Sequence, residues 1–328
     1  MMRISVVIGT RNRVSLLGVT LEHLRRQAYA AGDEVIVVDN ASTDDTAAVV
    51  ARAAAGFPVP LRYLVEEALG KSAAVNRGVS GARGEILALT DDDVQVAPDW
   101  IASIRRVFND GTVDLAGGRV DPWWESEAPW WLRWQRPESS AMLSPLALLH
   151  YGDAQALGER TAVGANLIVR RDVYEDLGGF NPDLGRQQGT LLCGEDHDFC
   201  MRAAASYRCV YRPEIRVRHW VPADRLRVRY FARWFYWSGI TNARLDALAR
   251  PQKPGHACRT LVAHMGKRLV TEAAKVVISA ATARPAAAVE HVMEAAYALG
   301  YLMECIRPAA VSRPAVRAVT TSAGTRVA

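Results

Sequence analysis

The strongest constraint on this fold is a short apolar run that ends abruptly in three carboxylates. Residues 86–90 read Ile-Leu-Ala-Leu-Thr and are followed by Asp91, Asp92 and Asp93. A run of this kind predicts a buried strand, and because acids cannot stay buried without a charged partner, the strand should end at an open cleft. Alternation along the chain places Asp91 and Asp93 on one side and Asp92 on the other. Carboxylates suit Mg²⁺ or Mn²⁺, which hold diphosphate oxygens. An acidic turn before a helix capped near Asp99 accounts for the same residues.

Strand-like runs alternate with helix-like runs through the first hundred residues. This alternation implies right-handed crossovers and a mainly parallel sheet, which binds ligands beyond the carboxyl ends of its strands. Three such ends carry Thr10, Asp39 and the segment 91–93, so they should converge on one crevice. Asp39 can accept hydrogen bonds from a ribose or a base, or satisfy its own turn. The loop 9–13 lacks the GxGxxG pattern, which argues against NAD. The expected strands are 4–8, 35–38, 61–64 and 85–90.

Turn and cap residues predict where the early helices begin and end. Ser42 followed by Asp45 has the spacing of a capping box, and it should open an alanine-rich helix that stops at Gly56. A further helix containing Asn76 and Arg77 is expected after residues 70–72, which read Gly-Lys-Ser.

Four segments carry a family resemblance in this order and spacing: 6–13 (Val-Val-Ile-Gly-Thr-Arg-Asn-Arg), 37–44 (Val-Val-Asp-Asn-Ala-Ser-Thr-Asp), 70–78 and 90–94 (Thr-Asp-Asp-Asp-Val). Together they resemble the nucleotide-binding half of the family-2 glycosyltransferases, which are inverting enzymes of the GT-A fold. The resemblance implies that Thr10 and Arg13 line the nucleotide pocket and that Asp39 binds the base or ribose.

The same resemblance assigns the acidic segment to the ribose and the metal. It implies that Asp91 and Asp92 belong to the nucleotide-binding residues and that Asp91 and Asp93 are metal ligands. Many members of the family have an arginine where this chain has Val75. Lys71 is therefore expected to supply the positive charge at the nucleotide.

The second half of the chain contains an acidic pair at the start of an expected helix. Residues 161–170 read as a strand, residues 178–180 form a Gly-Gly-Phe turn, and Glu195 and Asp196 follow Gly194. An inverting transfer needs a base that takes the proton of the attacking hydroxyl, and a helix N-terminus favours an ionised carboxylate. The resemblance places this base at Asp196, with Glu195 gripping acceptor or sugar hydroxyls. Acids also favour the first helical turn for structural reasons alone.

A histidine ends the strand-like alternation of residues 215–220. Family members often place a metal ligand here, and an imidazole suits Mn²⁺, so His219 is a candidate third ligand beside Asp91 and Asp93. His197, next to the acidic pair, is a weaker candidate.

The chain beyond residue 201 differs in charge from the part before it. Residues 1–201 carry 19 basic and 28 acidic groups (19 − 28 = −9), whereas residues 202–328 carry 21 and 7 (21 − 7 = +14). Residues 225–237 mix arginines with aromatic residues, which is typical of an interfacial helix, of a surface that stacks single-stranded nucleic acid, or of a helix packed under a catalytic domain. A tryptophan-rich segment within 117–160 is expected to form an acceptor-side loop.

These patterns divide the chain into a catalytic part and a C-terminal part. The expected fold is an α/β GT-A domain, like that of other nucleotide-diphospho-sugar transferases, with a mainly parallel sheet flanked by helices and a C-terminal helical region. Residues 1–222 form the catalytic domain, with a nucleotide-binding half (1–100) and an acceptor half (101–222). A basic amphipathic helical region (223–307) and a disordered tail (308–328) follow. No apolar run reaches the roughly 20 residues of a membrane span. The five cysteines include no CxxC pair, which favours a reducing cytoplasm.

The predicted function is a metal-dependent inverting glycosyl transfer. The donor is a nucleotide-diphosphate sugar, the cofactor is Mg²⁺ or Mn²⁺, and the acceptor is a saccharide or lipid-linked saccharide of surface-glycan, glycolipid or polysaccharide biosynthesis. The basic region suggests a cytoplasmic enzyme with peripheral contact at the inner face of the cell membrane, and no nucleic-acid partner is expected. Two alternatives are a nucleotidyltransferase of similar fold and a non-catalytic nucleic-acid-binding protein.

Overall fold

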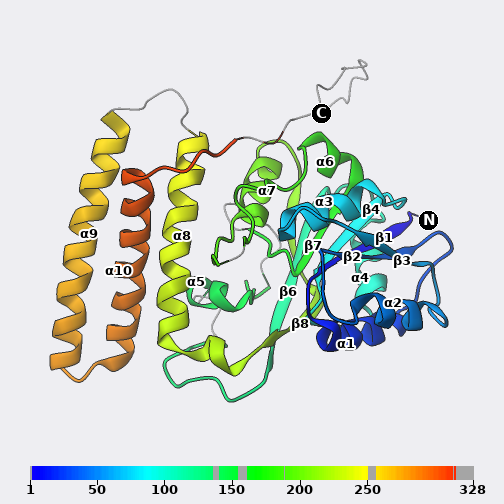
Figure 1. The fold of residues 1–328 in the computed structure, drawn as a ribbon, viewed down its shortest axis with the longest axis horizontal. Helices are drawn as coiled ribbons and strands as arrows, with labels where there is room; N and C mark the ends of the chain where they lie inside the picture. Colours follow the sequence, from blue (N-terminus) through cyan, green and yellow to red (C-terminus); the bar gives the residue numbers. More distant parts are fainter. Residues whose placement is uncertain are drawn as a thin grey trace.

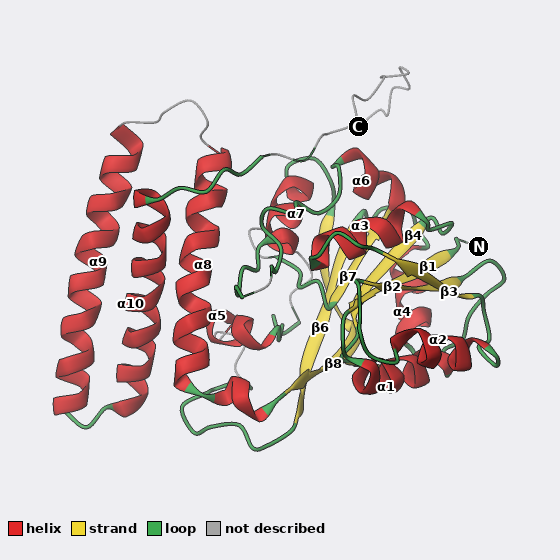
Figure 2. Ribbon diagram, viewed as in Figure 1, coloured by secondary structure: helices red, strands yellow, loops and turns green. Residues whose placement is uncertain are grey.

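The structure is a computed structural model that describes residues 2–135, 140–153, 161–187, 189–249, 256–312 and 314. A single mixed sheet forms the centre of the catalytic part, with helices packed on both of its faces (Figure 1). Three long helices extend from one side of this part (Figure 2). The expected α/β architecture with a C-terminal helical region is confirmed.

The sheet has the order β3-β2-β1-β4-β7-β6-β8-β5. Its first four strands are parallel, which confirms the expected crossovers, and β7 is antiparallel to both of its neighbours. Strands β1, β2 and β4 are buried almost throughout, because helices cover both faces of a parallel sheet. The strands are β1 (Ile4–Thr10), β2 (Glu34–Asp39), β3 (Leu61–Val65), β4 (Ile86–Asp91), β5 (Val94–Val96), β6 (Leu115–Trp124), β7 (Asn166–Arg170) and β8 (Cys209–Val221).

The helix α3 illustrates how closely the helices approach the sheet. A Cβ added at Gly78 would lie 2.4 Å from a methyl of Val7 and 2.9 Å from a methyl of Val38, so only a glycine permits this contact. Figure 1 shows α1 and α2 on the other side of the sheet. The helices of the catalytic part are α1 (Val14–Arg25), α2 (Thr46–Ala54), α3 (Lys71–Ser80), α4 (Trp100–Phe108), α5 (Ser140–Leu143), α6 (Arg171–Asp176) and α7 (Glu195–Ala204), with short 3₁₀ turns at Ser144–Leu146 and Ala223–Leu226.

The C-terminal helices are α8 (Val228–Ala249), α9 (His256–Ala281) and α10 (Pro285–Ile306). A pair of glycines brings α8 and α10 into backbone contact: a Cβ at Gly239 would lie 2.1 Å from the Tyr297 carbonyl oxygen, and one at Gly300 would lie 1.8 Å from the Tyr236 carbonyl oxygen. In Figure 1, α8 lies next to the catalytic part, α10 follows, and α9 lies farthest out. None of the helices in the described ranges is long and apolar enough to cross a membrane.

Some sequence expectations about local structure are wrong. Ser42 forms no capping box with Asp45; its hydroxyl accepts the Asn12 amide, and the α2 start is held by Asp44, which accepts the amide of Thr46. The strand expected over 161–170 begins only at Asn166 in β7.

The expected disordered tail at 308–328 lies mostly outside the described residues. The part of it that is described turns back onto the catalytic part. Both the amide and the hydroxyl of Ser312 donate to Asp183 at 3.0 Å, and Asn181 donates to the Ser312 carbonyl at 2.8 Å.

Candidate functional site

The carboxyl ends of β1 and β4 meet as expected, and a polar network joins them. The hydroxyl of Thr10 donates to Asp92 at 2.7 Å. The guanidinium of Arg13 contacts Asp92 at 3.1 Å and Asp93 at 2.7 Å. The strand β4 ends at Asp91, so Asp92 and Asp93 lie in the turn that leads into β5. This turn is fixed from α1 as well, because the Thr20 hydroxyl donates to the Asp92 carbonyl at 2.9 Å.

The pKa values of the two acids of this turn shift in opposite directions. Burial and the neighbouring Asp93 raise the pKa of Asp92 to about 6, against the effects of Arg13 and Thr10. Burial would also raise the pKa of Asp93, but His219 and Arg13 outweigh it and hold that pKa well below its ordinary value. Asp93 is therefore ionised at every physiological pH, as a metal ligand must be.

Asp91, Asp93 and His219 form a candidate metal centre. One ligand atom from each lies within 4.8 Å of the others, and β8 carries His219 to the turn after β4. The Nε2 atom of His219 lies 3.2 Å from Asp93 Oδ1. This carboxylate oxygen is buried and, among the described residues, accepts no well-aligned hydrogen bond. A buried carboxylate oxygen without such a bond fits the metal that the resemblance implies, because a hard cation would satisfy it.

Lys71 lies between this centre and the acidic pair of the second half. Its ammonium is 2.5 Å from Asp91 Oδ1. Burial would lower the pKa of Lys71, but Asp91, Glu195 and Asp196 raise it above its ordinary value, so the side chain stays charged. The lysine thus places a positive charge at the start of α3, beside Asp91.

Asp39 lies at the end of β2 but its carboxylate is engaged locally. It accepts the Tyr63 hydroxyl at 2.6 Å and the Ser42 amide at 2.8 Å. The next residue, Asn40, borders the cavity described below. Sequence reasoning singled out Asp39 and missed Asn40, whose amide ties residues 66–70 to this end of the sheet by donating to the carbonyls of Glu66 and Ala68.

The acidic pair begins helix α7 as expected. Asp196 accepts the Gly164 amide at 2.8 Å through one oxygen and the His197 amide at 2.8 Å through the other. Glu195 is buried and accepts the Gly194 amide at 3.1 Å. Burial, followed by the charge of Asp196, raises the pKa of Glu195 to about 7. At Glu195, burial therefore outweighs Lys71 and the backbone hydrogen bonds of the helix start, which lower this pKa.

His197 follows the acidic pair in α7 and is not one of the three residues of the candidate metal centre. Its Nδ1 atom lies 3.4 Å from the Thr161 hydroxyl, and the ring borders the same cavity.

A cavity of about 740 Å³ is lined by every site residue that the sequence predicted except Asp39. Arginines that the sequence analysis did not single out also line it, namely Arg11, Arg186 and Arg225. One face of α8 forms a wall through residues spaced three or four apart, which is the spacing of one helical face. These wall residues are Tyr230, Trp234, Ser238, Thr241, Asn242 and Leu245.

The packing of α8 supports one of the three interpretations of the aromatic and basic segment 225–237, that of a helix packed under a catalytic domain. Phe231 and Phe235 are buried in the main core, whereas Tyr230 and Trp234 face the cavity. Thr241 packs against the start of α7, since a Cβ at Gly194 would lie 2.3 Å from its methyl group. The segment therefore packs under the catalytic part, and its helical spacing was the signal that could have identified this wall.

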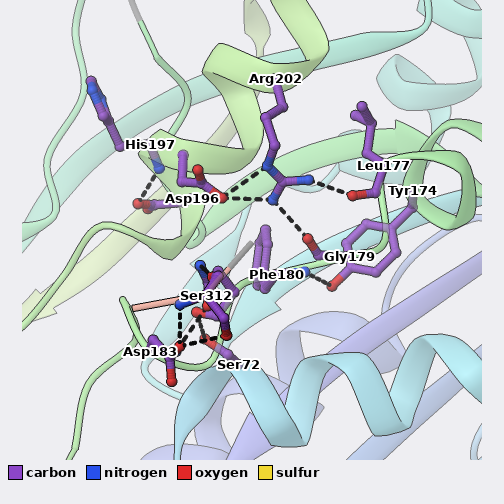
Figure 3. A network of polar contacts seen from close by, with 12 residues as sticks. Ser72, Tyr174, Leu177, Gly179, Phe180, Asp183, Asp196, His197, Arg202 and Ser312 are labelled. Carbon is purple, nitrogen blue, oxygen red and sulfur yellow. Dashed lines mark hydrogen bonds and ion pairs between the residues drawn. The ribbon is translucent and has the colours of Figure 1, made fainter. Parts of the chain in front are cut away.

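A second network joins the third motif to the Gly-Gly-Phe turn. Asn76 accepts from the Tyr174 hydroxyl at 2.6 Å and the Phe180 amide at 3.0 Å, and it donates to the Phe180 carbonyl at 2.9 Å. Figure 3 shows Arg202 of α7 donating to the carbonyls of Leu177 and Gly179. These bonds hold α7, and with it the acidic pair, against α3.

Comparison with protein families matches residues 5–178 to Glycosyl transferase family 2. The chain belongs to this family. It is a glycosyltransferase with the GT-A fold, which replaces both the nucleotidyltransferase and the non-catalytic alternatives.

Its relatives include a glucosyl-dolichyl phosphate glucuronosyltransferase of Haloferax volcanii, 25% identical over 75% of this chain and 78% of the relative. A beta-monoglucosyldiacylglycerol synthase of a Nostoc species is 27% identical over 55% of this chain and 38% of the relative. Among solved structures, the mannosyltransferase PcManGT from Pyrobaculum calidifontis, in complex with GDP-Man and Mn²⁺, covers 93% of this chain and 87% of its own. It has a TM-score of 0.62 and 22% identity, so it shows the fold alone.

Proposed function

We propose that this glycosyltransferase moves a sugar from a nucleotide-diphosphate sugar to an acceptor hydroxyl, with inversion and with a divalent metal. The observation that carries the proposal is the meeting of Asp91, Asp93 and His219 on the same cavity as the Glu195–Asp196 pair. The donor side lies at the ends of β1 and β4, where Thr10, Arg13, Asp92 and Lys71 are gathered. The acceptor side lies toward α8.

Each group on the donor side has a task set by its charge. Asp91, Asp93 and His219 would hold Mg²⁺ or Mn²⁺, which supplies charge neutralisation for the leaving diphosphate. Lys71 and Arg13 add fixed positive charge at the same end of the cavity. Mn²⁺ in the complex of PcManGT with GDP-Man supports this choice of cofactor and donor class. Asp39 is proposed to act on the base or ribose, with Tyr63 and Ser42 as its competing partners.

Asp196 is the proposed base. Each of its oxygens accepts one backbone amide, which fixes the carboxylate while leaving lone pairs free for the acceptor hydroxyl. A base must lie within hydrogen-bond reach of the proton that it removes, and Asp196 borders the cavity between the metal centre and the α8 wall. Glu195 is proposed to bind sugar hydroxyls, since a carboxyl whose pKa is about 7 can donate as well as accept hydrogen bonds at neutral pH.

The proposed acceptor is a saccharide or a lipid-linked saccharide of glycolipid, polysaccharide or surface-glycan biosynthesis. Two features support a sugar on this side: Tyr230 and Trp234 offer aromatic faces, and Ser238 and Asn242 offer polar groups beside them. The names of the Haloferax and Nostoc relatives, which mention dolichyl phosphate and a diacylglycerol, support a lipid-linked acceptor. We propose that the protein meets such an acceptor at the inner face of the cell membrane, as a cytoplasmic protein with peripheral membrane contact.

Calorimetric titration tests the donor site. UDP, GDP and dTDP are titrated with and without Mn²⁺ into the native protein, into Asp93→Ala and into the control Asp110→Ala, which removes an exposed carboxylate of a distant turn. We expect one diphosphate to bind only with Mn²⁺, and to bind Asp110→Ala but not Asp93→Ala. Absence of binding to the native protein under both conditions would contradict the proposal.

Release of nucleotide from the matching nucleotide sugar tests the base. Asp196→Asn is expected to bind the diphosphate normally but to turn over about 10²- to 10⁴-fold more slowly, because general base catalysis typically contributes that much. Turnover of Asp196→Asn at the native rate would assign the base elsewhere.

A further inference from the structure

The outermost helix, α9, contacts the protein from one side only along its described length. Its contacts with α10 include Met265, which is buried, an ion pair between Arg268 and Glu294, and a hydrogen bond between Glu272 and His291. Figure 1 shows α9 at the edge of the molecule farthest from the sheet. The opposite side of this helix therefore points away from the protein.

That opposite side is apolar and exposed. At about 100° per residue, Val270, Val277 and Ile278 lie roughly opposite Met265 around the helix. They are 71%, 68% and 59% exposed, which is unusual for β-branched apolar side chains of this size. Alanines fill the positions between them. We call this surface the outer face of α9; its apolar members are Ala263, Val270, Ala274, Val277, Ile278 and Ala281.

The charges around the outer face have one sign. Lys267 lies within it and Lys275 lies beside it, both with exposed side chains. Glu272 is the one acid between residues 256 and 281, and it is 9% exposed and bound to Lys275 and His291 at 2.7 Å each. A second copy of the chain seated here would bring lysines against lysines, whereas an anionic surface would be attracted to them.

We propose that the outer face of α9 rests on an anionic lipid bilayer as an interfacial helix. A helix of 26 residues is about 39 Å long at 1.5 Å per residue, and an apolar stripe with lysines at its border is the composition of a helix that lies in the membrane plane. The inference places the membrane contact on a surface distinct from residues 225–237, of which Arg225, Tyr230 and Trp234 line the cavity. It does not depend on the donor or the metal.

Sedimentation with vesicles tests the proposal on the full chain. Vesicles of phosphatidylcholine alone and of phosphatidylcholine with 30% phosphatidylglycerol are mixed at low salt with the native protein, with Val277→Glu and with Val65→Glu. The last variant is the matched control, because Val65 is a 51% exposed valine of β3, at the opposite end of the molecule. Urea unfolding of each variant confirms that it is folded.

We expect the native protein and Val65→Glu to sediment with the anionic vesicles, and Val277→Glu to bind them at least about tenfold more weakly. Sedimentation of native protein and Val277→Glu to the same extent would overturn the proposal, as would no sedimentation with anionic vesicles. Light scattering tests the alternative that a second copy of the chain covers this face. A native dimer that Val277→Glu converts to a monomer would show this and would overturn the proposal. The nucleotide titrations above are unaffected by any of these results.

Discussion

Glu195→Gln is expected to make the protein more stable at alkaline pH. The native carboxyl is buried beside Asp196, and its pKa is raised from 4.5 to about 7. Between these two pH values the folded protein binds more protons at Glu195 than the unfolded chain does, so stability falls as pH rises through this window. Glutamine has the shape of the protonated acid, keeps an oxygen for the Gly194 amide and cannot ionise.

The size of the effect follows from the two pKa values. The unfolded chain ionises Glu195 more readily than the folded protein does, and relative to a side chain that cannot ionise this lowers the stability of the folded protein by about 3 kcal/mol at pH 8 and by about 1 kcal/mol at pH 5. Urea unfolding of both proteins at pH 5 and pH 8 measures the difference, and titrating groups that do not interact with Glu195 cancel in the comparison. The gain in stability of Glu195→Gln should therefore be about 2 kcal/mol larger at pH 8 than at pH 5. An equal gain at the two pH values would refute the reasoning about this carboxyl.

Two other substitutions test the packing that positions the site, and a third serves as a control. Asn166 is fully buried; it accepts a hydrogen bond from Trp100 and donates to the carbonyls of residues 119 and 215. Asn166→Ala should therefore lower the free energy of unfolding in urea by about 3 to 5 kcal/mol, because each buried polar group left without a partner costs about 1 to 3 kcal/mol. A loss below about 1 kcal/mol would contradict this account. Gly300→Ala, whose new Cβ would meet the Tyr236 carbonyl at 1.8 Å, should lower the melting temperature, whereas Gly266→Ala on α9, with nothing within 4 Å, should raise it slightly.

The parts of the fold that sequence predicted are those set by local pattern. The apolar runs before Thr10, Asp39 and Asp91 predicted three adjacent parallel strands, because burial on both faces needs an unbroken apolar run. The meeting of Asp91, Asp93 and His219 followed from the family resemblance, and the structure brings the three together. The roles proposed for these residues stay predictions.

The parts that sequence could not predict depend on tertiary contact. Ser42 does not cap α2, because its hydroxyl accepts the amide of Asn12, which follows β1; Asp44 accepts the amide of Thr46 at the start of α2 instead. The α8 wall required knowing that α8 folds back over the start of α7, a contact between residues about 50 positions apart that leaves no local signal. The raised pKa of Glu195 likewise depends on burial by neighbours that the linear order does not reveal.

The two sides of the cavity come from different parts of the chain. The groups at the nucleotide end come from the first hundred residues and from His219, whereas the aromatic and amide groups opposite them come from a helix that begins at Val228. That helix is held by glycine contacts to α10 and by Phe231 and Phe235, which are buried in the main core. Substitutions along it can reshape one side of the cavity while every donor-side residue stays in place. If α8 binds the acceptor as proposed, substitutions in this one helix would change the acceptor of such a protein and leave its sugar donor unaltered.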